Sequence, residues 1–273
     1  MKKFLILLFF TITVVSVKGE DCHQKSEISY YSDSVCQRDE YIKSRCVLDV
    51  YYPTKLKNFA TIIWFHGGGL SAGQKEIPER LKNQGFCVIG VNYRLTPKVK
   101  ADKCIEDAAA AIAWTFKNIA SMGGDVTKIF VSGHSAGGYL TLMTGLDRRW
   151  LNAYGIDANK IAGLIPLSGQ AITHFAIREE RGIKREQPIV DEFAPLFFVR
   201  ADASPLILIT GDRELELLGR YEENAYLMRM MKISGHRFTK LYELQGYGHD
   251  MVEAGLPILI NEIRSILEKK VMK

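Results

Sequence analysis

A glycine-flanked serine stands between a predicted buried strand and a predicted helix. Residues 133–137 read Gly-His-Ser-Ala-Gly, after the apolar run Ile129–Val131 and before the helix-like stretch Tyr139–Met143. This pattern predicts a sharp strand-to-helix turn in which the Oγ of Ser135 points out above a sheet, with glycines where the chain passes too close for a side chain. The helix start would aim backbone N–H groups at developing negative charge. The pattern alone is also typical of an ordinary loop, so its meaning depends on the rest of the chain.

Composition favours one large α/β domain over residues 20–273. The chain has 273 residues, of which 47% are hydrophobic and 25% charged, and a single α/β core can reach ~250 residues. The net charge of +5 is modest. Basic residues are mixed with acidic ones, most densely in residues 178–185, so we expect no nucleic-acid partner.

The N-terminus has the pattern of a secretory signal peptide. Lys2 and Lys3 precede the apolar run Phe4–Val17, and the stretch up to Gly19 is suited to cleavage. We therefore expect residues 1–19 to be removed and the protein to be exported, to the periplasm or the medium. A membrane anchor is the alternative, but the apolar run falls short of the ~20 residues needed to span a bilayer. No stable membrane anchor is expected after cleavage.

Five cysteines follow the predicted signal peptide, so at least one must be free or paired between molecules. Cys87 lies in an apolar run and is expected to be a buried thiol. Cys36 and Cys46 flank a predicted hairpin, and an oxidising compartment could join them. The spacing does not select among pairings that also include Cys22 and Cys104.

The order of elements predicts a mostly parallel, twisted sheet with an antiparallel start and helices on both faces. Residues 28–34 and 46–52 are predicted to form the antiparallel pair. Further strands are predicted at residues 60–65, 86–93, 129–132, 161–167, 205–210 and 238–244, and helices at residues 78–84, 101–121, 222–234 and 257–270. In such sheets, ligands bind beyond the carboxyl ends of the strands.

Two further segments at predicted strand ends bear on the serine. His66–Gly69 reads His-Gly-Gly-Gly directly after the predicted strand 60–65, and its unobstructed N–H groups could bind an oxyanion, although a glycine triplet alone also suits a flexible turn. Ser135 needs a base, and His249 follows the last predicted strand in a loop. His174, in the irregular stretch 170–204, could also face the pocket. The remaining histidines are His23, His66, His134 and His236.

Together the two glycine motifs resemble those of the α/β-hydrolase superfamily, specifically its hormone-sensitive-lipase-like and feruloyl-esterase-like carboxylesterases. The resemblance runs from about Cys46 to the C-terminus. Segment 91–97 is similar to the family's Y-R-L-x-P segment, and Asp107 and the Gly-Gly-Asp of residues 123–125 also match. The resemblance implies an α/β-hydrolase fold and structural roles for Arg94 and Asp125 in bracing loops. It also implies an oxyanion hole made by the N–H groups of Gly68, Gly69 and Ala136.

The acid of the implied triad should follow the strand 205–210. Asp212, Glu214 and Glu216 compete there. The family's usual G-x-x-D spacing places the acid three residues past Gly211, so we predict Glu214, with Asp212 as the alternative. The resulting order of serine, acid and His249 matches the family order.

These residues predict an exported serine carboxylesterase that forms an acyl-enzyme on Ser135. The expected substrates are short-chain or aryl esters, including acetyl or feruloyl groups linked to polysaccharide. No cofactor or metal is expected, because the sequence has no H-E-x-x-H and no paired C-x-x-C. Two alternatives stay open: a serine peptidase or formamidase of the same fold, and a catalytically silent carbohydrate-binding module.

The segment 170–204 bears on substrate size. It is predicted to form a small lid or pocket wall over Ser135, with an amphipathic surface helix and loop as the alternative. It is too short for a large lipase lid, which favours small soluble esters. The oligomeric state is left open by the sequence.

Overall fold

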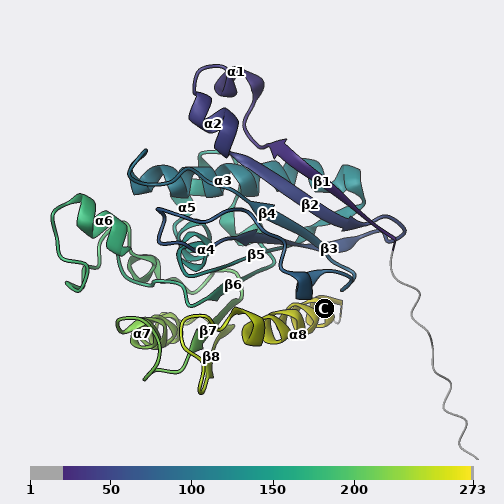
Figure 1. Cartoon of the computed structure of the whole chain (residues 1–273). Coiled ribbons are helices and arrows are strands. Elements are labelled where there is room, and N and C mark those ends of the chain that lie inside the picture. Colours follow the sequence, from purple (N-terminus) through teal and green to yellow (C-terminus); the bar gives the residue numbers. More distant parts are fainter. Residues whose placement is uncertain (1–20, 272–273) are drawn as a thin grey trace, which may run out of the picture.

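A computed structural model describes residues 21–271. Over this range the core is an eight-stranded sheet of order β1-β2-β4-β3-β5-β6-β7-β8 (Figure 1). Its strands are β1 (Cys22–Ser29), β2 (Val47–Pro53), β3 (Phe59–Phe65), β4 (Cys87–Val91), β5 (Gly124–His134), β6 (Gly163–Leu167), β7 (Leu206–Gly211) and β8 (Thr239–Leu244). β1 and β2 pair antiparallel, β2 joins β4 antiparallel, and the pairs from β4 to β8 are parallel. The predicted α/β-hydrolase architecture, with its antiparallel start, is confirmed.

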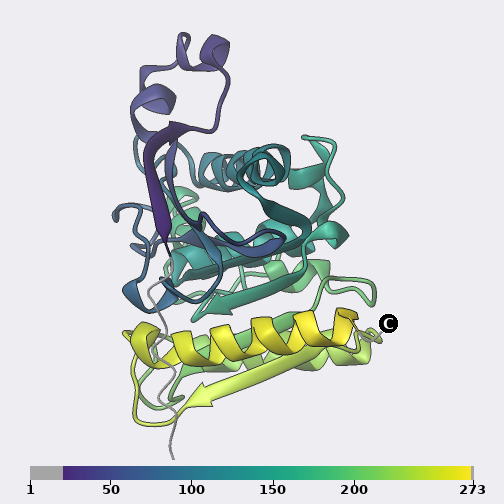
Figure 2. The ribbon, with the colours of Figure 1, turned by 90° about the vertical axis from the view of Figure 1, so that its right-hand side faces the viewer.

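Helices cover both faces of the sheet because the strands are apolar on both faces. In β3, Ile63 and Phe65 pack into one hydrophobic cluster and Ile62 and Trp64 into the other. The first cluster includes residues of α3 (Ala101–Asn118), α4 (Ala136–Leu146), α5 (Arg148–Asn152) and α7 (Arg220–Ile233). The second includes residues of α8 (Val252–Val271), which crosses the opposite face of the sheet (Figure 2).

The connection between β1 and β2 differs from the predicted hairpin. Two short helices, α1 (Asp33–Cys36) and α2 (Glu40–Arg45), lie there and project together beyond the sheet (Figures 1 and 2). Asp39 caps α2 by accepting hydrogen bonds from the N–H groups of Tyr41 and Ile42, which favours a helix start over a turn. The strand partner of β2 therefore lies earlier, from Cys22. All five cysteines of the described residues are free thiols, so Cys36 and Cys46 are not joined.

Two predicted helices have different bounds. Only a 3₁₀ turn, η1 (Glu79–Leu81), forms within residues 78–84. In contrast, α8 begins at Val252, five residues before the predicted start at Pro257. A proline inside a helix removes one hydrogen bond, but α8 buries an apolar stripe that includes Leu256, Leu259 and Ile263. Packing of this stripe on the sheet outweighs the local cost.

The stretch between β6 and β7 contains a short helix, α6 (Phe175–Glu180), and a 3₁₀ turn, η4 (Pro195–Phe198). The remaining 3₁₀ turns are η2 (Ile119–Met122), which continues α3, and η3 (Ala158–Lys160) before β6. Within residues 21–271, no helix is both long and apolar enough to cross a membrane. The predicted signal peptide, residues 1–19, and its cleavage point lie outside the described residues.

Candidate active site

Ser135 occupies a strained turn between β5 and α4. Its backbone has φ 55° and ψ −113°, a conformation that is costly for a residue with a side chain. The turn also needs glycine at position 137, because a Cβ there would lie 1.9 Å from the carbonyl oxygen of Phe65 on the neighbouring strand β3. The strained backbone of Ser135 and the close contact of Gly137 with β3 thus define a sharp turn. This turn places the serine at the carboxyl end of β5, as the sequence predicts.

Three side chains from separate strand ends form a hydrogen-bonded chain. The Oγ of Ser135 lies 2.8 Å from Nε2 of His249, and Nδ1 of His249 lies 2.8 Å from Oε1 of Glu216. Ser135 follows β5, Glu216 follows β7 and His249 follows β8. The side chain of His249 is 18% exposed and that of Glu216 only 1%. This is the arrangement of a nucleophile, a base and an acid that orients the base.

The prediction of Glu214, or alternatively Asp212, as the acid beside His249 is wrong. Glu216 occupies that place, while Glu214 is exposed to solvent. Asp212 instead organises its own loop: its carboxylate accepts hydrogen bonds from the N–H groups of Glu214, at 2.9 Å, and Gly246, at 2.8 Å.

A helical turn after β7 explains the displacement of the acid. The N–H groups of Leu215 and Glu216 both donate to the carbonyl oxygen of Asp212, at 3.0 and 2.8 Å. Arg213 anchors the same loop to β8 through Glu243, with Nε to Oε1 at 2.9 Å and Nη2 to Oε2 at 2.6 Å. The turn takes up two more residues than the usual spacing allows, so the glutamate that reaches His249 stands five residues past Gly211.

The surroundings of Glu216 keep it ionised. Burial raises the pKa of this carboxyl group, but the hydrogen bond from His249, together with the positive charge of Arg220, outweighs burial, and its pKa lies below the ordinary value. A carboxylate that stays charged can fix the Nδ1–H tautomer of His249 and leave Nε2 free to accept the proton of Ser135.

His134, inside the glycine motif, positions the loop that carries the base. Its Nε2 lies 2.8 Å from the carbonyl oxygen of His249, and the two rings lie 4.7 Å apart between centroids. Because a carbonyl only accepts, Nε2 of His134 carries the hydrogen. Burial, followed by the nearby His249, lowers the pKa of His134 to about 4, so this imidazole is neutral at neutral pH.

The predicted oxyanion residues border Ser135 from two sides. A Cβ placed on Gly67 would lie 3.5 Å from the Cβ of Ser135, so the loop before Gly68 and Gly69 runs beside the serine. Gly68 has φ +109°, and a Cβ on it would lie 2.3 Å from the carbonyl oxygen of Ala72. Ala136 is the buried first residue of α4. The glycine loop and the start of α4 therefore both border the turn that carries Ser135.

The segment after β4 holds the glycine loop in place. The hydroxyl of Tyr93 donates to the carbonyl oxygen of His66 at 2.8 Å, and the two rings stack with centroids 4.4 Å apart. The N–H of Thr96 donates to the carbonyl oxygen of Leu70 at 2.9 Å. Both ends of the His66–Leu70 loop are therefore tied to residues 93–96.

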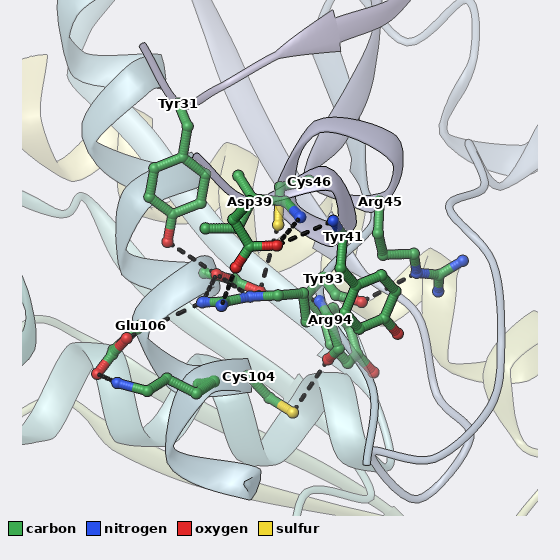
Figure 3. Close-up of polar contacts among 12 residues, drawn as sticks. Tyr31, Asp39, Tyr41, Arg45, Cys46, Tyr93, Arg94, Cys104 and Glu106 are labelled. Atoms are coloured by element: carbon green, nitrogen blue, oxygen red, sulfur yellow. Dashed lines mark hydrogen bonds and ion pairs between the residues drawn. The ribbon is translucent and has the colours of Figure 1, made fainter. Parts of the chain in front are cut away.

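A buried ion pair fixes this bracing segment to α3. The guanidinium of Arg94 donates to the fully buried carboxylate of Asp107, with Nη2 to Oδ1 at 2.7 Å and Nε to Oδ2 at 2.9 Å. Asp107 also accepts from the N–H of Arg94 and the hydroxyl of Tyr31. Figure 3 shows Arg94 at the centre of this cluster, with Glu106 and Asp39 further from its guanidinium. The predicted bracing role of Arg94 fits these contacts.

Other residues singled out in the sequence have local roles. His174 is buried, and its Nδ1 accepts the hydrogen of the Ala176 N–H at the start of α6. His236 lies between Thr239 and Ala203. Asp125 accepts from the N–H and hydroxyl of Thr127 and pairs with Lys128, all near the start of β5. Among residues 21–271, no group of three or more histidine, cysteine, aspartate or glutamate side chains could hold a metal ion.

Sequence comparison relates the chain to esterases. The BD-FAE family model matches residues 48–160. Esterase LipC of Mycobacterium tuberculosis is 27% identical over 205 residues, which are 68% of this chain and 50% of LipC. A probable isoprenylcysteine alpha-carbonyl methylesterase of Oryza sativa is 28% identical over 64% of this chain and 46% of its own length. An arylesterase of Saccharolobus solfataricus is 38% identical over 37% of this chain and 34% of its own length. The chain spans about half or less of the length of these relatives.

Solved structures share the fold over most of the chain. A truncated carbohydrate esterase from gut microbiota has a TM-score of 0.72 at 19% identity, covering 92% of this chain and 98% of that one. Esterase B from Lactobacillus rhamnosis has a TM-score of 0.71 at 19% identity, covering 92% and 89%. The sheet order and these structures show that the chain has an α/β-hydrolase fold, and the matched family model and the relatives show that it is similar to esterases.

Proposed function

We propose that this protein is a serine carboxylesterase that works through an acyl-enzyme. The observation that carries the proposal is the chain of two 2.8 Å contacts from the Oγ of Ser135 through His249 to Glu216. The names of the related proteins support an ester as the substrate. In this proposal Glu216 takes the place that the sequence pattern assigns to Glu214.

In the first half-reaction, the Oγ of Ser135 attacks the ester carbonyl while Nε2 of His249 takes its proton. The N–H groups of Gly68, Gly69 and Ala136 stabilise the tetrahedral oxyanion, and losing one such donor typically costs about 3 kcal/mol of transition-state stabilisation. His249 then protonates the departing alcohol, which leaves the acyl group on Ser135. In the second half-reaction, Nε2 of His249 takes a proton from water as the water attacks the acyl carbonyl, and then returns this proton to the Oγ of Ser135 as the carboxylic acid leaves.

The proposed substrates are small, soluble short-chain or aryl esters. The short stretch between β6 and β7, with the six residues of α6, supports a small pocket over a large lipase lid. The carbohydrate esterase among the structural relatives makes ester groups on polysaccharide a reasonable substrate class to test. We further propose export, which rests on the signal-peptide pattern of residues 1–19.

A panel of p-nitrophenyl acetate, butyrate and octanoate, methyl ferulate and p-nitroanilide amides tests the proposal. Wild type should hydrolyse the acetyl or butyryl ester, and Ser135→Ala should lose at least 1,000-fold in kcat/KM, as expected for removal of a triad member. Fast anilide cleavage with slow ester cleavage would favour an amidase instead. Equal rates for wild type and Ser135→Ala would contradict the proposed nucleophile.

A further inference from the structure

A cavity of about 470 Å³ lies beside the candidate active site. One side is formed by the stretch that contains α6, residues 170–188, and the other by the loop after Glu216 and the first turns of α7, residues 217–226. Figure 1 shows the stretch that contains α6 on the same side of the sheet as the start of α7. The cavity is open to solvent and has both apolar and charged walls.

Two residues connect this cavity to the triad and the glycine loop. Phe175 lines it, and the ring of Phe175 lies 2.9 Å from the position that a Cβ on Gly69 would take. Leu217 also lines it and directly follows the acid Glu216. Ser135 and His249 do not themselves line the cavity. It is therefore placed to hold a part of the ester several bonds from the carbonyl that Ser135 would attack.

Arg178 is the unusual group in this cavity. Its residue is only 3% exposed, and its Nη1 donates to the carbonyl oxygen of Gln187 at 2.5 Å. Among residues 21–271, its Nε has no hydrogen-bond acceptor, and no carboxylate oxygen lies within 4.0 Å of its guanidinium. A buried cation without an ionic partner is costly, which points to a partner that arrives with a ligand.

The two other arginines in the cavity wall are already engaged. Arg220 donates to the carbonyl oxygen of Ser168 and is paired with Glu223 at 4.0 Å through its Nε, although this Nε, like that of Arg178, makes no hydrogen bond. Arg185 is exposed and stacks over the ring of Phe175 at 4.3 Å, with Glu179 at 3.8 Å. Arg178 is thus the cation that is both buried and unpaired.

Burial, opposed by the charge of Glu223 and reinforced by those of Arg220 and Arg185, lowers the pKa of Arg178 below its ordinary value. Glu186 and Glu222 are exposed at the rim, and Glu223 accepts a hydrogen bond from the N–H of Ala171. Burial, followed by the charges of Arg220, Arg178 and Arg185, holds the pKa of His174 well below the ordinary value. An anion that reaches Arg178 would meet a guanidinium whose residue is only 3% exposed, where a charged hydrogen bond is strong.

We propose that this cavity binds a carboxylate carried by the ester substrate and that Arg178 selects it. Apolar neighbours, among them Ile172, Leu217, Leu218 and Tyr226, would contact the carbon skeleton between that carboxylate and the scissile ester. The substrate class is an ester with a second, ionised carboxyl group in its acyl or alcohol part. This inference rests on the proposed esterase function and adds the substrate class to it.

Two matched pairs of esters test the inference. Mono-p-nitrophenyl glutarate is compared with p-nitrophenyl pentanoate, which places the charge in the acyl part, and 4-carboxyphenyl butyrate with phenyl butyrate, which places it in the alcohol part. In one of the pairs, wild type should prefer the charged ester by at least tenfold in kcat/KM, chiefly through KM. Raising the salt concentration should reduce that preference.

Arg178→Gln should abolish the preference and change kcat/KM for the neutral ester by less than threefold. Arg178→Lys keeps the charge but loses the paired N–H donors of the guanidinium, so it should retain part of the preference for the charged ester. Arg149→Gln is the control, because Arg149 lies in a different, exposed place and pairs with Asp147. If Arg178→Gln does not fold, a reduced preference in Arg178→Lys with unchanged neutral-ester turnover supports the inference.

Two outcomes would overturn the inference: no preference for either charged ester in wild type, or an equal loss on charged and neutral esters in both Arg178 variants. Failure of wild type to hydrolyse any neutral ester would instead count against the proposed esterase function. The two failures are therefore distinguishable.

Discussion

Oε1 of Glu216 lies 2.8 Å from Nδ1 of His249, while the exposed Glu214, only two residues earlier, lies outside the site. The helical turn after Asp212 determines which glutamate contacts His249, because it rotates position 216 toward the histidine and position 214 toward solvent. The acid of this candidate triad is thus set by loop geometry that a fixed spacing rule does not capture.

The first prediction concerns the acid. Glu216→Gln should lower kcat for p-nitrophenyl butyrate roughly 1,000- to 10,000-fold, because the amide no longer fixes the His249 tautomer or stabilises its charged form. Glu214→Gln is the matched control and should stay within about twofold of wild type, since its side chain is exposed. Steady-state kinetics of the three proteins checks this. A large loss in Glu214→Gln with little change in Glu216→Gln would reverse the assignment.

The second prediction concerns the glycine loop. In Gly68→Ala, the added Cβ would approach the carbonyl oxygen of Ala72 to 2.3 Å, so the loop must move and ester hydrolysis should fall by more than 100-fold. Gly155→Ala also imposes a left-handed φ, +70°, but nothing lies within 4 Å of its Cβ. It should cost about 1 kcal/mol of stability and little activity. Wild-type activity in Gly68→Ala would show that the loop does not contribute to catalysis.

The third prediction concerns the ion pair behind the site. Asp107→Asn removes the buried carboxylate that the guanidinium of Arg94 contacts most closely, leaving only Asp39 and Glu106 at 3.7 and 3.9 Å, and should reduce the free energy of unfolding by about 3–5 kcal/mol. Glu40→Gln breaks a surface pair with Lys43, whose side chains are 79% and 62% exposed, and should cost less than about 1 kcal/mol. Urea denaturation of both variants measures the difference. Equal stabilities would mean that the Arg94 cluster adds nothing to the fold.

The fourth prediction concerns pH. The pKa of His134 is about 4 in the folded protein, below the ordinary value of 6.5, so between these values the unfolded chain binds more protons at this site. The free energy of unfolding should therefore fall as pH is lowered from 6.5 to 4, with a contribution from His134 of at most roughly 3 kcal/mol. Denaturation curves at several pH values should give a smaller pH dependence for His134→Gln than for wild type. An identical slope for both proteins would exclude His134 as the cause.

The sequence predicts most of the sheet because its strands are buried on both faces and read as apolar runs. The run of residues 60–65 and the run of residues 161–167 correspond to β3 and β6 within two residues. The serine turn is equally predictable, because Gly137 leaves no room for a side chain and Ser135 must adopt its strained conformation at the end of β5.

The differences arise where local signals are weak or where tertiary contacts decide. Helix α8 continues through Pro257 because its apolar face packs on the sheet, which a local breaker rule does not include. Helices α1 and α2 are only four and six residues long, too short for a periodic pattern. Glu216 becomes the partner of His249 through backbone hydrogen bonds to Asp212 and the clamp of Arg213 on Glu243. In the sequence, this turn corresponds to Asp212 followed by an acidic residue at every second position, Glu214 and Glu216.

The nucleophilic character of Ser135 is the central claim, and covalent labelling tests it most directly. A fluorophosphonate should add once to the wild-type protein, with the added mass on the peptide that contains Ser135, and with loss of ester hydrolysis in proportion to labelling. Ser135→Ala should take up no label under the same conditions. Stoichiometric labelling of Ser135→Ala, or an unlabelled wild type that still hydrolyses esters, would contradict the account.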